Sequence, residues 1–311
     1  MRIAFIGIGA LGSYFGGRLA KAGNDVIFIA RGAMLEVLRK EGLRVESPLG
    51  NFALPKVHAT SDPTGVGLVD AVFVTTKAWQ VAEAAQQIRS TIGPETIVVP
   101  LQNGVEAYGQ LAAVLGSEHV LEAMCHILAM VTAPGVVRHA GAKALITVGE
   151  RNNMRTQRLE RLVECLSAAE LDTRIPDNIQ VALWEKFEFV ASFGAVGAVT
   201  RAPAGVIRSL PEARSLLERA VQEIAGLARA SDIPVPNESV ASTMKLVDSA
   251  PADATSSMQR DLVAGRPSEL EAQSGAVVRL GFASHFPTPV HEIIYNALLP
   301  GELRSRGKLT F

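Results

Sequence analysis

Hydrophobic and polar positions change their spacing near the middle of the chain. In the first half, short apolar runs such as "RIAFIG", "DVIFIA", "DAVFVTT", "TIVVPL" and "HVLEAMC" alternate with segments of helical spacing such as "AWQVAEAAQQIRSTIG". The runs are almost continuously apolar, as expected of strands that helices cover on both faces. This alternation predicts βαβ units, and therefore an α/β fold of the Rossmann type with a doubly wound parallel sheet.

The second half carries helical spacing and little strand signal. Asp177 followed by Gln180 is a capping-box pattern, and Pro211 is typical of the first residue of a helix. We therefore expect two domains. A Rossmann-type domain spans residues 1–175, and an all-α domain spans residues 176–311.

Composition narrows the classes of function. The 311 residues include 30 Lys and Arg against 31 Asp and Glu, so the net charge of -1 offers no broad field for nucleic acid or an anionic membrane. No apolar run reaches the roughly 18 residues of a membrane span, and glycines interrupt the N-terminal run where a signal peptide would continue. Two cysteines make neither a disulfide framework nor a zinc pattern. We expect a cytoplasmic protein that acts on a small molecule, without nucleic-acid or membrane partners.

The segment "GIGALG" follows the first predicted strand and opens a helix. In this setting Gly7 permits a tight turn, Gly9 lets the backbone approach a pyrophosphate, and Gly12 lets helix and strand pack closely. The helix N-terminus then presents N–H groups to the phosphates. The alternative is a glycine-rich turn that binds nothing. The expected cofactor-binding residues are Gly7, Ile8, Gly9, Ala10, Leu11 and Gly12.

The second predicted strand ends in "IFIARG", with Arg31 at the position where NAD-binding proteins place an acid. No acid lies between Asp25 and Glu36. A planar guanidinium can hold a phosphate on the 2′ oxygen through two hydrogen bonds, whereas a carboxylate would repel it. Arg31 therefore favours NADP(H) over NAD(H). The alternative is a solvated arginine at the start of a loop.

Further polar side chains lie where they could bind a ligand or take part in catalysis. Lys77 in "TTKAWQ" and Asn103 in "LQNGV" follow predicted strands, at the sheet edge where ligands bind. They could reach the cofactor or the substrate, or be an exposed lysine and an ordinary Asn-Gly turn. Lys186 shares a helix face with apolar residues, where it is either a candidate proton donor or a lysine reaching solvent. The capping-box pair Ser268 and Glu271 predicts a helix start there.

Together these pieces resemble the ketopantoate reductases (2-dehydropantoate 2-reductases). They occur in the family's order and cover nearly the whole chain. The resemblance implies a Rossmann-type NADPH domain and a helical domain with the active site in the cleft between them; the helical domain would also carry the contact if the chain forms a homodimer. The matching pieces are "GIGALG", Arg31, "TTKAWQ", "LQNGV", "WEKF", "TRAPAG" and "SSMQRDLVAGRPSELE".

The resemblance implies reduction of an α-keto acid to a 2-hydroxy acid, which in the namesake enzymes is ketopantoate reduction in pantothenate synthesis. Lys186 matches the family's catalytic lysine, and Glu269 its active-site glutamate, which also meets the cofactor. Asn103 matches the cofactor and substrate asparagine, Ser257 the substrate serine, and Lys77 the lysine of the cofactor cleft. Pattern alone places Glu269 in the first turn of the helix predicted at Ser268, where it would complement the helix dipole.

The chain departs from the family where asparagines would hold the substrate. Val190, Gly194, Ala204 and Ser274 stand at those positions, while Arg201 is either a substitute for carboxylate binding or a helix-end surface residue. A more apolar pocket discriminates poorly between substrates of similar shape. Three alternatives therefore stay open. They are a reductase of a more apolar α-keto acid, a non-catalytic NADPH-binding regulator, and a different two-domain dehydrogenase of the β-hydroxyacid or opine type.

Overall fold

The computed structural model describes all residues from Met1 to Phe311 and divides them into two compact units. The first unit comprises Met1–Gln102 and Ala107–Ile179. The second comprises Asn103–Glu106 and Gln180–Phe311. The short segment Asn103–Glu106 therefore belongs with the helical half, although the chain enters it from the sheet.

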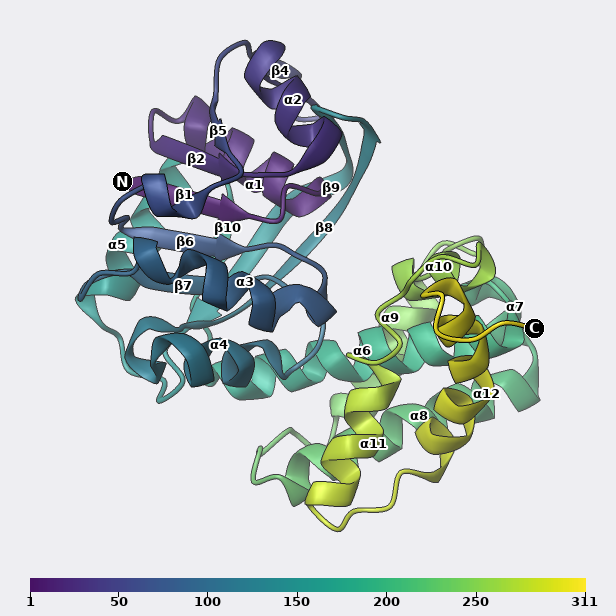
Figure 1. The fold of residues 1–311 in the computed structure, drawn as a ribbon. Helices are drawn as coiled ribbons and strands as arrows, with labels where there is room; N and C mark the ends of the chain where they lie inside the picture. Colours follow the sequence, from purple (N-terminus) through teal and green to yellow (C-terminus); the bar gives the residue numbers. More distant parts are fainter. The chain divides into compact units, whose positions relative to one another are not determined.

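The first unit is built on a five-stranded sheet in which every pair of neighbours is parallel (Figure 1). The strands lie in the order β5-β2-β1-β6-β7. The chain adds strands on one side of β1 and then returns to add β6 and β7 on the other side, which is the doubly wound arrangement that the sequence predicts. The carboxyl ends of β1 and β6 therefore flank the point where ligands bind in such sheets. The strands are β1 Arg2–Ile6, β2 Asp25–Ile29, β5 His58–Thr60, β6 Ala71–Val74 and β7 Ile97–Pro100.

Helices cover both faces of this sheet, which explains the continuous apolar strands. Phe5 packs on one face, where its ring stacks on Phe73 with centroids 4.7 Å apart, in a core shared with α1 and α5. Ala4 and Ile6 point to the other face, into a core shared with α3 and α4. The helices are α1 Ala10–Lys21, α2 Gly32–Lys40, α3 Val81–Ile88, α4 Ala107–Leu115 and α5 Gln157–Ala168.

The first unit also contains a second, mixed sheet, of which the sequence pattern predicts only the start of β8, in the run "HVLEAMC". Its order is β10-β9-β3-β4, and β8 pairs antiparallel with β9. The β8–β9 ladder carries two register irregularities, and its distal part exposes apolar side chains such as Leu128 and Met130. Both features erase the regular alternation that marks a strand in sequence. The strands are β3 Leu43–Glu46, β4 Phe52–Leu54, β8 Glu122–Ala133, β9 Val136–Gly149 and β10 Asp172–Arg174.

The second unit is entirely helical, as predicted. Pro211 is the first residue of α8, which confirms the helix start expected there. The start expected from Asp177 is slightly displaced, because α6 begins at Ile179, whose N–H donates to Asn153 Oδ1 at 2.9 Å. No helix is long and apolar enough to cross a membrane. The helices are α6 Ile179–Thr200, α7 Ala204–Ser209, α8 Pro211–Ala230, α9 Ser239–Ser249, α10 Ser257–Val263, α11 Ser274–Ala283 and α12 Pro289–Ser305.

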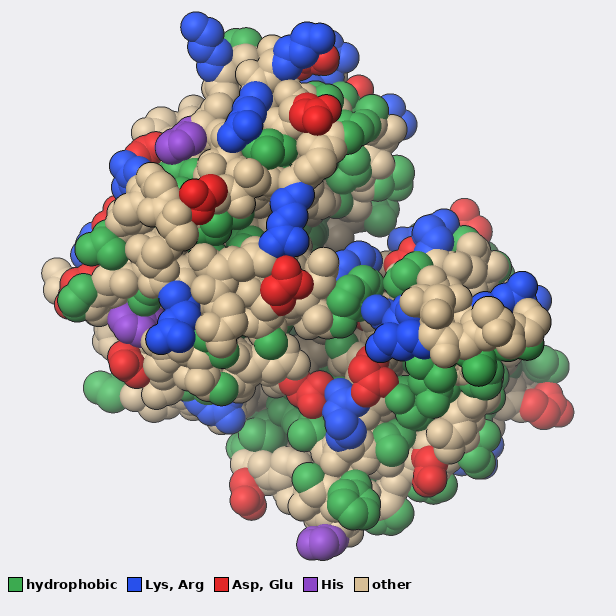
Figure 2. Space-filling model, viewed as in Figure 1, with side chains coloured by type: hydrophobic (Ala, Val, Ile, Leu, Met, Phe, Trp, Pro, Cys, Tyr) green, Lys and Arg blue, Asp and Glu red, His purple; other side chains and the backbone are tan.

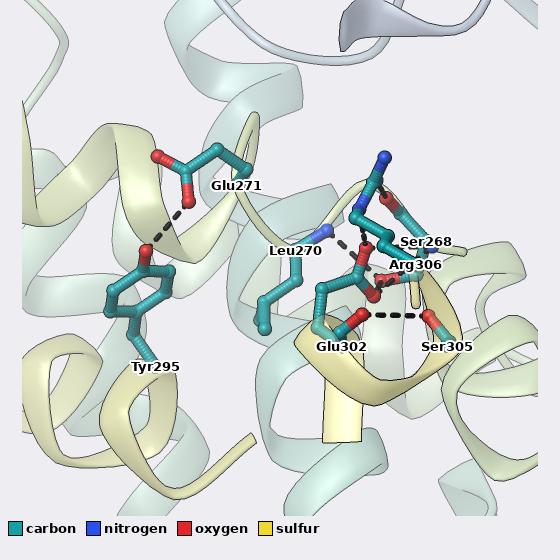
Figure 3. Close-up of polar contacts among 7 residues, drawn as sticks. All are labelled: Ser268, Leu270, Glu271, Tyr295, Glu302, Ser305 and Arg306. Atoms are coloured by element: carbon teal, nitrogen blue, oxygen red, sulfur yellow. Dashed lines mark hydrogen bonds and ion pairs between the residues drawn. The ribbon is translucent and has the colours of Figure 1, made fainter. Parts of the chain in front are cut away.

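The helix predicted to begin at Ser268 is wrong in its start. The N–H and Oγ of Ser268 bind the buried carboxylate of Glu302, at 3.1 and 2.6 Å, and Arg306 Nε binds the same carboxylate at 2.6 Å (Figure 3). A single helical turn then closes on the carbonyl oxygen of Glu269. The α-helix α11 begins only at Ser274. Glu269 therefore lies in the turn before the helix. Glu302 accepts the N–H of Ser268, which Glu271 would accept in a capping box, and the Oγ of Ser268 accepts from the N–H of Leu270 at 3.2 Å rather than from that of Glu271.

Charged side chains are mixed on the surface. On the face drawn in Figure 2, Lys and Arg lie among Asp and Glu, with no broad area of a single sign. The charge that matters for binding is therefore local.

Candidate active site

The glycine-rich turn after β1 is packed against the end of β6. Gly7 has a φ of +90°, and a Cβ on it would lie 2.4 Å from the backbone nitrogen of Thr76. A Cβ on Gly12 would lie 2.7 Å from Thr75 Oγ1, which itself donates to the carbonyl oxygen of Gly7 at 2.8 Å. Gly9, by contrast, has no atom within 4 Å of its Cβ position. Two glycines thus permit packing, and the third leaves its outer side open for a ligand to approach.

The N-terminus of α1 fits the pyrophosphate of a dinucleotide. Gly9 precedes the helix without a side-chain cap, and the first turn contains no acid. The backbone N–H groups at Ala10, Leu11 and Gly12 therefore lie at the positive end of the helix, where an anion is stabilised. The side chain of Ile8 is buried in the core of the unit, so only its backbone faces this turn.

Arg31 lies directly after β2 and precedes the first residue of α2. Its side chain is 64% exposed, and its Nη2 lies 3.2 Å from Glu83 Oε1 on α3, which is 58% exposed. An exposed ion pair of this kind contributes little free energy, so the guanidinium can exchange this partner for a phosphate. Sequence reasoning missed Glu83, because 52 residues separate it from Arg31 and only the fold brings them together.

Lys77 follows β6 beside the glycine-rich turn. Its side chain is exposed, and its ammonium lies 5.8 Å from the ring centroid of Trp79. The buried side chain of Gln102 fixes this end of the sheet, since its amide donates to the carbonyl oxygens of Val74 and Thr76 at 2.9 and 3.0 Å. Gln102 is a second positioning residue that the pattern did not single out. Lys77 therefore belongs to the same edge of the first unit as the glycines.

Lys186 and Asn103 meet in the second unit. Lys186 Nζ donates to Asn103 Oδ1 at 3.1 Å. Lys186 lies on a half-buried stripe of α6 that also includes Ala182 and Phe189, whereas Phe193 of the predicted face is buried in the helical core. The bond to the amide oxygen fixes where the ammonium sits on an otherwise apolar face.

Two contacts hold the segment containing Asn103 against the turn that carries Glu269. Gly104 has a φ of +114°, and a Cβ on it would lie 2.9 Å from the carbonyl oxygen of Ala272. Arg279 on α11 binds Glu106 at 2.8 Å. Glu269 itself is only 9% exposed. The structure thus brings Asn103 and the Glu269 turn onto one side of the helical unit, together with Lys186.

Arg279 and a tyrosine support the same turn through Glu271. Arg279 forms an ion pair with Glu271. Tyr295 Oη donates to Glu271 Oε2 at 2.6 Å, as Figure 3 shows. Burial, with a further contribution from Glu271, raises the pKa of Tyr295 to about 12. Tyr295 therefore stays protonated and remains a donor to Glu271 across the neutral range.

The remaining predicted residues lie further along α6 and beyond it. Ser257 is the exposed first residue of α10, and its neighbour Ser256 places its Oγ 3.4 Å from the Cβ position of Gly194. Arg201 is exposed just past the end of α6, with a left-handed φ of 55°. That conformation is typical of a residue that ends a helix. Ser256 thus lies against α6 at Gly194 and Ser257 is the next residue, while Arg201 has the geometry of the helix-end alternative.

A buried carboxylate lies close to Lys186 in sequence but on another face of α6. Glu188 is fully buried, and Thr243 Oγ1 donates to its Oε2 at 3.3 Å. Burial raises the pKa of Glu188 from 4.5 to about 7. The folded state therefore holds this proton more tightly than the unfolded chain does. The stability that Glu188 contributes falls as the pH rises from about 4.5 to about 7, and changes little above that.

Glu188→Gln should remove this pH dependence. We expect the variant to gain free energy of unfolding relative to the unmodified protein on going from about pH 5 to about pH 8, by roughly 2 kcal/mol. Urea unfolding at both pH values measures the gain. Glu218→Gln, an exposed carboxylate on α8, is the control and should show no such difference. The same stability difference at both pH values would contradict the assignment.

The fold and these groups define a class of protein. A Rossmann-type unit with an open anion site, joined to an all-α unit bearing a fixed lysine, defines an oxidoreductase with a nicotinamide dinucleotide cofactor. Comparison with known proteins gives the family. The model described as "Ketopantoate reductase PanE/ApbA" matches residues 3–153, and the one described as "Ketopantoate reductase PanE/ApbA C terminal" matches residues 178–302. The chain belongs to the ketopantoate reductase family.

Individual relatives support this assignment to the family. A 2-dehydropantoate 2-reductase of Halobacterium salinarum is 32% identical over 292 residues, covering 93% of this chain and 95% of its own. The PanE/ApbA family ketopantoate reductase of Ralstonia eutropha superposes with a TM-score of 0.90 at 28% identity, covering 98% of this chain and 100% of its own. D-mandelate dehydrogenase, solved with NADH and anilino(oxo)acetate, superposes with a TM-score of 0.89 at 22% identity, over 98% of this chain and 99% of its own, a likeness that shows the fold.

Proposed function

We propose that the protein reduces an α-keto acid to the 2-hydroxy acid with NADPH, and that the substrate is ketopantoate, reduced to pantoate for pantothenate biosynthesis. The observation that carries this proposal is the hydrogen bond between Lys186 and Asn103 on an apolar helix face. This bond places side by side an ammonium that can donate a proton and an amide that can hydrogen-bond a substrate or cofactor. The family to which the chain belongs supports the same activity.

Each residue of the site has its own role in the proposed reaction. The bound cofactor supplies the hydride. Lys186 stabilises the negative charge that grows on the substrate oxygen and then donates its proton there, while Asn103 holds the ammonium in place. Glu269 orients the reacting hydroxyl or the lysine from its nearly buried turn, and Ser257 donates to the substrate carboxylate.

The first unit supplies the dinucleotide site in this proposal. The backbone from Gly7 to Gly12 holds the pyrophosphate, and Lys77 adds a positive charge at the same edge. Arg31 binds the 2′-phosphate and thereby selects NADPH. The support for this selection is the exposed guanidinium at the end of β2, whose carboxylate partner Glu83 is equally exposed.

Glu83→Gln should strengthen NADPH binding. The carboxylate of Glu83 competes with the phosphate for Arg31, and it also repels that phosphate. We expect the Kd for NADPH to fall about two- to fivefold at low salt, with the Kd for NADH unchanged, as measured by fluorescence titration. Glu95→Gln, a carboxylate elsewhere in the same unit, is the control. A weaker affinity for NADPH in Glu83→Gln would show that Glu83 belongs to the cofactor site instead.

One observation favours an alternative class of substrate, the more apolar α-keto acids. Val190 is half-buried on the α6 stripe next to Lys186, at a position where the family places an asparagine. An apolar side chain there favours a more apolar α-keto acid. A non-catalytic NADPH-binding regulator would need the dinucleotide site but not the contact between Lys186 and Asn103, and the presence of that contact argues against it.

The test is NADPH oxidation against a panel of substrates. The panel contains ketopantoate, branched and aromatic α-keto acids, β-keto acids, and amino acids paired with keto acids. Our proposal predicts the highest kcat/KM with ketopantoate. A higher kcat/KM with an apolar α-keto acid would identify the paralogous reductase. Activity only with β-keto acids or amino acid pairs would place the chain with another dehydrogenase type, and cofactor binding without oxidation of any pair would indicate a regulator.

A further inference from the structure

Gln273 is a fully buried amide at the residue before α11, and it has no protein partner. Its exposed fraction is 0%, and neither its Oε1 nor its Nε2 makes a hydrogen bond. A primary amide carries two donors and an acceptor, and burying them all without partners is costly. Buried polar groups without a hydrogen-bond partner are rare in proteins. We therefore look for a functional reason for the one at Gln273.

The amide oxygen of Gln273 lies against Gly194. A Cβ on Gly194 would be 3.1 Å from Gln273 Oε1 and 3.0 Å from Met258 Cε. Gln273 therefore fills the space that a side chain at position 194 would occupy. The glycine on α6 thus leaves this space to an amide that comes from the start of α11.

Gly194 lies two turns along α6 from Lys186, and it is buried where Lys186 and Val190 are half-buried. Lys186, Val190 and Gly194 follow one another at intervals of four residues along α6. Lys186 and Gly194 are about 12 Å apart along the helix, a span that two long side chains and a short branched keto acid can fill. The N-terminus of α10, with Ser256 and Ser257, lies beside the Gly194 end.

A polar side chain next to Gln273 also lacks a hydrogen-bond partner. Ser274, the next residue and the first of α11, is fully buried, and its Oγ makes no hydrogen bond. The methyl end of Met258 shares the space above Gly194. A methionine side chain adopts many rotamers, so Met258 is the group that moves when a ligand reaches the amide.

We propose that Gln273 determines substrate specificity by hydrogen-bonding a hydroxyl at the far end of the substrate's side chain, while Lys186 serves the keto group at the other end. This inference rests on the proposed function, since it takes the substrate to be an α-keto acid. It adds that the acid carries a hydroxyl, because an apolar side chain would leave the buried amide without a partner. It therefore decides against the more apolar substrate that Val190 alone would favour.

Two substrates that differ by one hydroxyl test the inference. Ketopantoate and trimethylpyruvate have the same carbon branching, and only ketopantoate carries the terminal hydroxyl. We expect the unmodified protein to prefer ketopantoate by at least about tenfold in kcat/KM. Gln273→Leu keeps a similar volume and should reduce that preference to within about twofold, chiefly by raising KM for ketopantoate. Because the substitution removes a buried amide without partners, the Tm should not fall.

Two further variants separate this role from a structural one. Gln259 is a buried glutamine beside Gly197, one turn along α6, and its amide donates to the carbonyl oxygen of Ala202 at 3.0 Å. Gln259→Met should lower the Tm and leave the ratio of the two substrates unchanged. Gln273→Ala combined with Gly194→Asn returns the amide to α6 and should restore part of the preference for ketopantoate.

The outcomes distinguish the inference from the function on which it rests. Equal kcat/KM for the two substrates in the unmodified protein, or an undiminished preference in Gln273→Leu, would overturn the role of Gln273 and leave the reductase intact. Absence of NADPH oxidation with every α-keto acid would overturn the proposed function. The hydroxyl preference is then read from the Kd of pantoate against that of its deoxy analogue in the presence of NADP⁺. A ratio near one would overturn the inference, and a ratio that Gln273→Leu abolishes would support it.

Discussion

Lys186→Ala should lower kcat for the reduction of the α-keto acid by at least about a hundredfold. The alanine removes both the charge that stabilises the developing oxyanion and the proton that completes the reaction. The Kd for NADPH should stay within about twofold, because the groups proposed to bind its phosphates, from Gly7 to Gly12 and at Arg31, belong to the other unit. Stopped-flow and steady-state assays of NADPH oxidation measure the first effect, and fluorescence titration measures the second.

Lys245→Ala provides the matched control for Lys186→Ala. Lys245 is an exposed lysine on α9 of the same helical unit, so its removal changes the net charge equally. Its kcat should be that of the unmodified protein. If Lys186→Ala retained near-normal turnover on the best substrate, the proton donor would be another group and the mechanism proposed for this site would be wrong.

The second large effect is a change of cofactor preference. Arg31→Asp should raise the Kd for NADPH by about ten- to a hundredfold, because two charge-assisted hydrogen bonds are lost and a carboxylate repels the 2′-phosphate. The Kd for NADH should change little, or fall, since an acid at this position suits the ribose hydroxyls. Titration of both cofactors with both proteins gives the four constants needed.

Lys40→Asp controls for the change in net charge. Lys40 is exposed at the far end of α2 from Arg31, so this variant makes the same two-unit change in charge without touching the end of β2. Its effect on NADPH should be small and should vanish as salt is raised. Equal affinity of the unmodified protein for NADPH and NADH would remove the selecting role from Arg31.

Patterns that act locally in the chain could be recognised before the structure. The parallel sheet follows from its short, continuously apolar strands, and the dinucleotide turn follows from glycines placed between a strand and a helix. Gly7 and Gly12 are required by contacts with Thr76 and Thr75, just after β6, which gives the motif a steric basis in this fold. The same locality explains why the start of α8 at Pro211 is predicted correctly.

Features that depend on distant residues could not be predicted. The capping box expected at Ser268 does not form, because the N–H of Ser268 binds Glu302, 34 residues away, and not Glu271. Arg31 was recognised, but its partner Glu83 was not, since only the fold sets α3 beside the end of β2. Gln273 belongs to no local pattern at all. Its interest comes from burial, from missing partners, and from the glycine that faces it, three facts that no stretch of sequence displays together.

The most direct test of the account is a measurement of the product. The protein is incubated with ketopantoate and NADPH, and pantoate and NADP⁺ are quantified by mass spectrometry over the course of the reaction. Our account predicts one pantoate for each NADP⁺ formed, with both products absent from the Lys186→Ala reaction on the same timescale. Ketopantoate that remains unreduced while another α-keto acid is turned over, or NADP⁺ that accumulates without pantoate, would contradict it.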